Sequence, residues 1–86
     1  MFELLQRPHA ARQLRQLRKN HHPLIKPISE AITELSENPR PRGATRLVNR
    51  AEWKIRVGSF RVLYEIDDER QTVTIVSVAD RRDVYK

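Results

Sequence analysis

The stretch from Glu52 to Ile66, E-W-K-I-R-V-G-S-F-R-V-L-Y-E-I, alternates in character for a dozen residues and breaks only at Gly58-Ser59. Alternation with a period of two indicates β-strands. A glycine-led pair between two such runs is typical of a two-residue hairpin turn in which glycine adopts a positive φ. Counting outward from this turn predicts the cross-strand pairs Val57–Phe60, Arg56–Arg61, Ile55–Val62, Lys54–Leu63 and Trp53–Tyr64.

This register gives the hairpin two different faces, because successive side chains of a strand point to opposite sides. One face carries Trp53, Ile55, Val57, Phe60, Val62 and Tyr64. The other carries Lys54, Arg56 and Arg61, framed by Glu52 and Glu65. Two arginines in directly opposed positions repel each other. We interpret the three cations as a surface that receives an anion; simple solvated arginines are the alternative.

A chain of 86 residues has the length of one domain, and we expect residues 1–86 to form a single one. The absence of cysteine excludes a disulfide framework and a thiolate metal site, and it suits a reducing cytoplasm. The longest apolar runs are only a few residues, too short to cross a membrane. The first eight residues include an acid and no basic segment before an apolar stretch, so they do not read as a signal peptide.

The charge is positive and unevenly distributed. The net charge is +6, and 13 of the 17 basic residues are arginine, whose fork suits bidentate contacts with phosphate. Residues 4–29 contain six basic residues and no acid, and residues 40–56 contain six basic residues against one acid. The second run includes Arg46 and Arg50, which we predict to bind RNA. This asymmetry is typical of a nucleic-acid footprint, and it would also suit an acidic protein partner.

The order of elements predicts an α+β fold with two helices on one face of an antiparallel sheet. We expect a strand at residues 2–6, a helix from Pro8 or His9 to Lys19, a break at residues 20–23, and a second helix to about Glu37. After the helices, a short strand at residues 45–49, the central hairpin and a last strand at residues 72–79 are expected to form a three- to four-stranded antiparallel sheet. The register of the last strand is left open, because turns of four and five residues put opposite faces inward.

Familiar catalytic and metal-binding patterns are absent from the sequence, which has two glycines, no cysteine and three histidines without metal spacing. We therefore expect no metal or cofactor. The remaining candidates are the hairpin cations together with Arg81, Arg82 and Tyr85, which follow the last strand. A tail that folds back over the cationic face would place a phenol among cations, which lower a phenol's pKa. Such a group could take the proton of a 2′-hydroxyl while the cations stabilise the attacked phosphate.

The segment from Trp53 to Tyr85, W-K-I-R-V-G-S-F-R-V-L-Y-E-I-D-D-E-R-Q-T-V-T-I-V-S-V-A-D-R-R-D-V-Y, resembles the RelE branch of the RelE/ParE toxins of bacterial toxin–antitoxin systems. The preceding strand, helices and N-P-R-P exit fit the same family, so the resemblance covers nearly the whole chain. It implies a RelE-like fold and an endoribonuclease that cuts mRNA in the ribosomal A site, in contact with ribosomal RNA. It also implies a cognate antitoxin that holds the enzyme inactive.

The resemblance also implies roles for individual residues. Lys54 matches the first strand lysine, and Arg61 matches the arginine that contacts the scissile phosphate. Arg81 matches the arginine assigned to the leaving group, with Arg82 as the alternative because the interval to the tyrosine is short. Tyr85 matches the tyrosine proposed as general base. Arg56 stands where some members have a second lysine, and we predict that it binds RNA, as does Arg82.

Two other functions remain open from the sequence. One is a ParE-like inhibitor of DNA gyrase, which binds protein and needs no catalytic residues. The other is a non-catalytic RNA-binding module, for which positive charge alone suffices.

Overall fold

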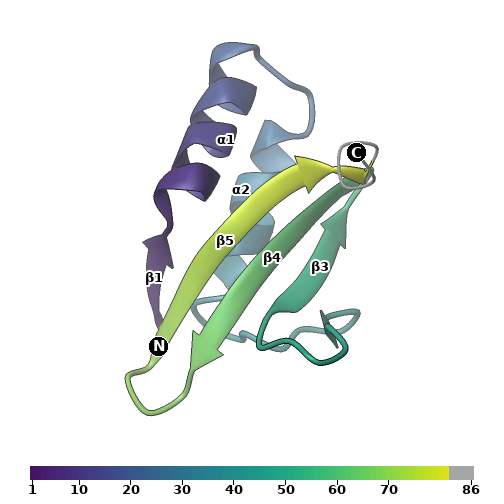
Figure 1. The fold of residues 1–86 in the computed structure, drawn as a ribbon. Coiled ribbons are helices and arrows are strands. Elements are labelled where there is room, and N and C mark those ends of the chain that lie inside the picture. Colours follow the sequence, from purple (N-terminus) through teal and green to yellow (C-terminus); the bar gives the residue numbers. More distant parts are fainter. Residues whose placement is uncertain (82–86) are drawn as a thin grey trace.

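Within the part of the chain that the structure describes, two helices cover one face of a five-stranded sheet (Figure 1). The computed structural model describes residues 1–81. Its elements are β1 (Glu3–Gln6), α1 (Pro8–Lys19), α2 (Ile25–Glu34), β2 (Thr45–Arg46), β3 (Trp53–Val57), β4 (Phe60–Asp67) and β5 (Thr72–Asp80). The strand order is β1-β5-β4-β3-β2, with β1 parallel to β5 and all other neighbours antiparallel. The predicted α+β fold is confirmed. The sheet has five strands and is mixed, whereas three to four antiparallel strands were predicted, because the N-terminal strand joins the same sheet as a parallel edge strand.

Two predicted boundaries are wrong. Helix α2 ends at Glu34 rather than about Glu37, because the amides of Leu35, Ser36 and Glu37 bond to carbonyls three residues back, in tight turns. Strand β2 ends at Arg46 rather than at residue 49. There the chain bends back toward β3: the Leu47 amide donates to the Glu52 carbonyl, and Asn49 has a φ of 58°.

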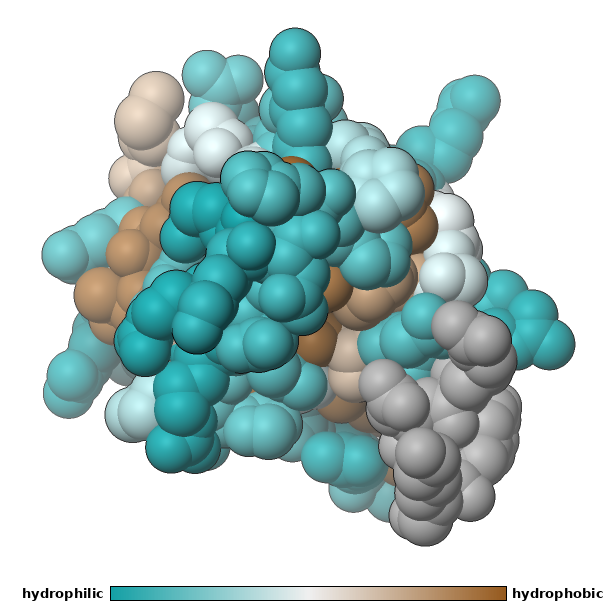
Figure 2. Space-filling view, turned by 90° about the horizontal axis from the view of Figure 1, so that it is seen from above, coloured by the Kyte–Doolittle hydropathy of each residue, from teal (hydrophilic) through white to brown (hydrophobic). Residues whose placement is uncertain are grey.

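The connection between the helices closes α1 through a left-handed residue. His21 has a φ of 52°, and the amide of His22 donates to the carbonyl of Leu17 over 2.9 Å. This is the hydrogen-bond pattern that ends many helices. His22 then accepts the amide of Leu24 on its Nδ1 over 3.0 Å and contacts the Phe60 ring edge-on. The loop between the helices therefore rests on the hairpin end of the sheet. Viewed from above, the surface of the molecule is mainly polar, with apolar patches between the polar side chains (Figure 2).

The core lies between the helices and the sheet. It consists of Ala10, Leu14, Ile28, Ile32, Leu35, Ile55, Phe60, Val62, Tyr64, Val73, Ile75 and Val78. Four of these come from the predicted apolar face of the hairpin, and the register of β3 on β4 agrees with the prediction at all five pairs. Gly58 supplies the positive φ of 58°, while Ser59 keeps a negative φ, as a type II′ turn requires. None of the helices within residues 1–81 is long and apolar enough to cross a membrane.

The observed register of β5 on β4 shows why the sequence alone could not determine this register. The turn has four residues, with Asp67 opposite Thr72, and Val73 and Ile75 point into the core. A β-bulge then follows, because Tyr64 pairs with Ile75 while its neighbour Leu63 pairs with Ser77, which leaves Val76 unmatched. Beyond the bulge, the inward residue is Val78. Because the inward positions change from odd to even residue numbers at the bulge, no single alternation of inward and outward side chains describes the whole strand.

Polar contacts fix the strands around the core. The amide of Val78 donates to Oε1 of Gln13 on α1 over 2.6 Å. Strand β1 pairs with β5 only up to Gln6, so beyond that point α1 provides the hydrogen-bond partner at this edge of β5. The hydroxyl of Tyr64 donates to the Pro39 carbonyl over 2.7 Å. Arg40 lies over the Trp53 ring, at 5.4 Å from its centroid, and its guanidinium pairs with Asp68.

The hairpin turn generates a first prediction. A Cβ at position 58 would lie 2.8 Å from Cδ1 of Leu24, and alanine disfavours the local backbone. We expect Gly58→Ala to lower the free energy of unfolding by about 1–3 kcal/mol in urea denaturation. In a Leu24→Ala background the loss should be smaller, because the clash is removed. An equal loss in both backgrounds would show that the contact with Leu24 has no energetic role.

The buried tyrosine generates a second prediction. Burial raises the pKa of Tyr64 to about 12, against about 10 for an unfolded tyrosine. Between these values the unfolded chain releases a proton that the folded chain retains, so stability should fall as the pH rises from 10 to 12. In Tyr85→Phe, Tyr64 is the remaining tyrosine, and phenolate absorbance should titrate well above pH 10. A midpoint near 10 in the folded protein would contradict this assignment.

Candidate nucleic-acid interface

The face of the sheet turned away from the helices, here called the open face, faces the viewer in Figure 1. The register places Thr45 of β2 opposite Lys54 of β3, and Arg56 of β3 opposite Arg61 of β4. Because directly paired residues point to the same side of a sheet, all four belong to the open face. The cations predicted from the hairpin pattern are therefore side by side on one surface.

A hollow of about 230 Å³, here called the Arg61 hollow, lies on the open face. It is lined by Leu47, Arg50, Lys54, Arg61, Leu63, Ser77 and Ala79. The bulge in β5 explains its presence, because it places the small side chains of Ser77 and Ala79 opposite Leu63 and Arg61. Without the bulge, the alternation set by Val73 and Ile75 would turn Val76 and Val78 outward at these places.

The charge of the Arg61 hollow comes mainly from two half-buried cations, Lys54 and Arg61. The third basic residue in its lining, Arg50, contacts both carboxylate oxygens of Glu52, at 3.1 and 3.0 Å. These hydrogen bonds from Arg50 lower the pKa of Glu52, which therefore stays ionised at neutral pH. Half-buried cations are less screened by salt than fully exposed ones, so an anion in this hollow would be held more firmly than on an open surface.

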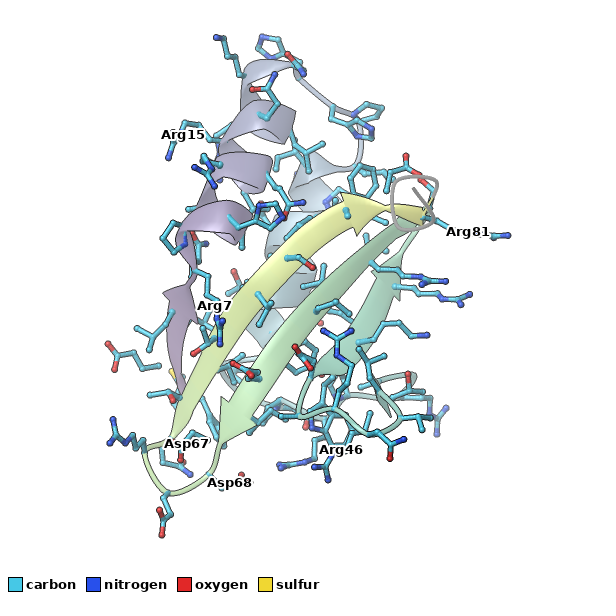
Figure 3. All side chains as sticks on the ribbon, viewed as in Figure 1. Arg7, Arg15, Arg46, Asp67, Asp68 and Arg81 are labelled. Atoms are coloured by element: carbon cyan, nitrogen blue, oxygen red, sulfur yellow. The ribbon has the colours of Figure 1, made fainter. Side chains whose placement is uncertain are left out.

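Two further predicted residues lie at the hairpin end of this face. Arg56 is exposed and stands directly opposite Arg61. Arg81 follows the end of β5, where its amide donates to the Ser59 carbonyl over 2.7 Å. The position of Arg81 next to the hairpin turn can be seen in Figure 3.

The remaining predicted residues do not join this group in the described part of the chain. Arg46 pairs with Trp53, so the register assigns it to the other side of the sheet from Lys54. It lies away from Arg81, in the lower half of the view in Figure 3. Its Nε donates to the Arg50 carbonyl at 3.5 Å. Arg82 and Tyr85 lie outside the described residues 1–81, so their predicted roles stay predictions.

The far end of the open face has the opposite charge. A larger hollow of about 600 Å³ there is lined in part by the carboxylates of Glu65, Asp67, Asp68 and Glu69. Arg7 pairs with Glu65 over 2.6 Å, and Arg40 pairs with Asp68 over 2.8 Å, which lowers the pKa of Asp68. Carboxylates repel phosphate. A polyanion is therefore attracted to the Arg61 hollow and not to this larger one.

The arrangement can bind a phosphate and stabilise negative charge that develops on it. Among the described residues, those that line the Arg61 hollow include no carboxylate, histidine or tyrosine that could act as a base. Tyr64 points into the core, and its raised pKa keeps it protonated at neutral pH. Among residues 1–81, no three His, Cys, Asp or Glu side chains are grouped closely enough to hold a metal ion.

Sequence reasoning missed the apolar and small residues of the Arg61 hollow. Leu47 belongs to the loop after β2, and Ser77 and Ala79 are turned outward by the bulge. The sequence signal for this part of the hollow was the presence of two small residues, Ser77 and Ala79, two positions apart in the last strand. It could not be interpreted without the register.

Solved toxin structures share this fold. The isolated Escherichia coli RelE toxin superposes with a TM-score of 0.79 over 99% of this chain and 92% of that chain, at 22% identity. The toxin–antitoxin complex RelBE2 from Mycobacterium tuberculosis matches with a TM-score of 0.73 over 93% of this chain and 98% of that chain, at 29% identity. The architecture is thus that of small bacterial toxins.

Sequence comparison gives the family. The model of the ParE toxin of the type II toxin–antitoxin system parDE matches residues 4–85. Toxin RelG of Mycobacterium tuberculosis is 34% identical over 85 residues, which cover 92% of this chain and 98% of RelG. The chain belongs to the RelE/ParE superfamily of type II toxin–antitoxin toxins and is of the RelE type, which confirms the family resemblance found in the sequence.

The opposed arginines generate a third prediction. Because like charges across a strand pair destabilise a sheet, Arg56→Glu should raise the free energy of unfolding by about 0.5 kcal/mol. The gain should shrink as salt is added, because the attraction to Arg61 is screened. Urea denaturation at low and high ionic strength measures both effects.

The control for this prediction is the same substitution in an Arg61→Ala background. The gain should disappear there, because the facing cation is gone. A gain of the same size in both backgrounds would mean that Arg56 is destabilising for some other reason.

Proposed function

We propose that this toxin is a metal-independent endoribonuclease that cuts mRNA in the ribosomal A site. The observation that carries the proposal is the Arg61 hollow, in which Lys54 and Arg61 are half-buried on a rigid sheet face with the exposed Arg56 beside them. A single-stranded RNA phosphate fits the charge of this place, and membership of the RelE/ParE superfamily supports a toxic activity.

The proposed reaction uses the RNA's own 2′-hydroxyl. Its oxygen forms a bond to the neighbouring phosphorus while the bond from phosphorus to the 5′-oxygen breaks, which yields a cyclic phosphate and a 5′-hydroxyl. Tyr85, as its phenolate, takes the 2′-proton and becomes a neutral phenol. Lys54 and Arg61 stabilise the charge on the phosphate oxygens, as cations do at transferring phosphoryl groups. Arg81, or Arg82 in its place, stabilises the negative charge on the leaving 5′-oxygen, which takes a proton from water to become the 5′-hydroxyl. Arg56 binds RNA but relays no proton, because a guanidinium stays protonated.

The proposal includes a protein partner and a place of action. A cognate antitoxin, acidic or with an amphipathic segment, holds the toxin inactive, either by covering the cationic face or by displacing the Tyr85 tail. The complex RelBE2 is a toxin–antitoxin assembly of a related fold. Residues 1–86 act as one RelE-like toxin domain in the cytoplasm, where mRNA and ribosomes are available.

A second candidate function follows from the description of the matching family model, the ParE toxin of parDE. A ParE-like toxin would inhibit DNA gyrase by binding it, without catalysis. The half-buried cations of the Arg61 hollow favour the ribonuclease, because binding to gyrase gives no reason to gather them around a small hollow.

The test is cleavage of translated mRNA by wild-type protein and by three variants. Arg61→Ala, Lys54→Ala and Tyr85→Phe should each lower the rate of codon-linked cleavage by about 100-fold or more, since each removes a group that acts in the transition state. Primer extension on ribosome-bound mRNA locates the cuts, and circular dichroism checks that each variant is folded.

A matched control removes a cation elsewhere. Arg15→Ala takes one charge from the part of α1 that faces away from the sheet (Figure 3), and it should leave the mapped cut positions unchanged. Wild-type protein that produces no codon-linked cuts would refute the ribonuclease. Loss of gyrase supercoiling activity under the same conditions would establish the second candidate.

A further inference from the structure

A second cationic hollow adjoins the first and has no role in the mechanism so far. It has a volume of about 410 Å³ and is lined by Arg42, Gly43, Thr45, Lys54, Ile55 and Arg56. We call it the Arg42 hollow. Lys54 lines both it and the Arg61 hollow, so the two are neighbours across β3.

The short length of β2 accounts for the Arg42 hollow. Strand β2 pairs only with Trp53 and Lys54, so within residues 1–81 the outer side of Ile55–Val57 has no strand neighbour. The chain before β2 bends there: Gly43 has a φ of 91°, and the Ala44 amide donates to the Pro41 carbonyl over 3.0 Å. This bend brings Arg42 to the side of β3 that Thr45 and Lys54 also face.

The chemistry of the lining selects an anionic ligand. Arg42, Lys54 and Arg56 contribute three cations, Thr45 contributes a hydroxyl, and no carboxylate from the described residues is part of the lining. No ion pair joins Arg42 or Arg56 to an acid among residues 1–81, in contrast to Arg50. A peptide strand could hydrogen-bond to the uncovered edge of β3, but it would leave this charge unmatched. A phosphate would match it.

The cations of the two hollows form a row that runs across the strands of the sheet. Arg61 is on β4, Lys54 and Arg56 are on β3, and Arg42 and Thr45 lie at the position of β2. Neighbouring strands are about 5 Å apart, so the cations span about 10 Å perpendicular to the strands. A single-stranded RNA that crosses the strands in this direction would meet the two hollows in succession, with Lys54 between them.

We propose that the Arg42 hollow binds the backbone phosphate next to the scissile one, with Arg42 as its main ligand. This inference rests on the proposed ribonuclease function and extends it. Arg42 would bind and align the RNA without touching the reacting atoms, and Lys54 would contact both phosphates.

The test uses ribosomes programmed with short synthetic mRNAs whose cleavage position has been mapped with wild-type toxin. In two further mRNAs, an uncharged methylphosphonate replaces the phosphate one step to the 5′ side or one step to the 3′ side of the cut. For each mRNA, the toxin concentration that gives the half-maximal cleavage rate is compared between wild type and Arg42→Ala. Arg70→Ala serves as the control, because it removes the same charge from the distant, exposed turn between β4 and β5.

We expect Arg42→Ala to raise that concentration about tenfold on the unmodified mRNA, because a hydrogen bond to a charged group is lost. On one of the two methylphosphonate mRNAs, wild type should itself be weakened, and Arg42→Ala should weaken it no further. Arg70→Ala should resemble wild type on all three. This pattern would assign the neighbouring phosphate to Arg42 and give the direction of the strand.

Three results would overturn the proposal. They are an Arg42→Ala protein that behaves like wild type, a loss no larger than that of Arg70→Ala, and a loss of equal size on both modified mRNAs. In each of these cases wild-type toxin still cleaves, so the ribonuclease function would stand. If wild-type toxin cleaves none of the mRNAs, the ribonuclease function fails and the subsite fails with it.

Discussion

The pairing of β4 with β5 is the constraint on which the rest of the structure depends. Strand β4 is central: its inward side chains Phe60, Val62 and Tyr64 form the middle of the core, and its outward side carries Arg61. The bulge at Val76 lets β5 satisfy both sides at once. It keeps Val78 in the core after Ile75, and it turns Ser77 and Ala79 outward, where small side chains leave room beside Arg61. One extra residue thus joins a close-packed core to a hollow on the opposite surface.

How much could be predicted depended on whether the signal was local. The hairpin register was predicted pair by pair, because Gly58 fixes the turn and a one-residue slip would expose the whole apolar face. The ends of α2 and β2 were missed, because the tight turns after Glu34 and the bend at Asn49 depend on hydrogen bonds that propensity does not reveal. The phase of β5 could not be settled for the same reason: a bulge is defined by the partner strand.

The candidate site also has a part that local sequence predicts and a part that depends on tertiary contacts. Lys54, Arg56 and Arg61 share a face because of their spacing in the sequence, and spacing is local. The ion pair that engages Arg50, and the register that turns Arg46 to the other side, both arise from the loop between β2 and β3. Composition alone made all the arginines of that region look equivalent. The opposed pair Arg56 and Arg61 also shows a cost that a purely structural sheet would avoid, since opposite charges at these positions would be more stable. Stability is often reduced at functional sites in this way.

The separation of charge along the open face has a consequence for the approach of the molecule to a partner. Cations lie toward the hairpin end and carboxylates toward the turn between β4 and β5, so the surface has an electric dipole roughly along its strands. The field of a polyanion exerts a torque on this dipole, which turns the hairpin end toward the polyanion before any contact is made. Encounters are thereby biased toward one orientation, and the bias weakens as salt shortens the range of the field.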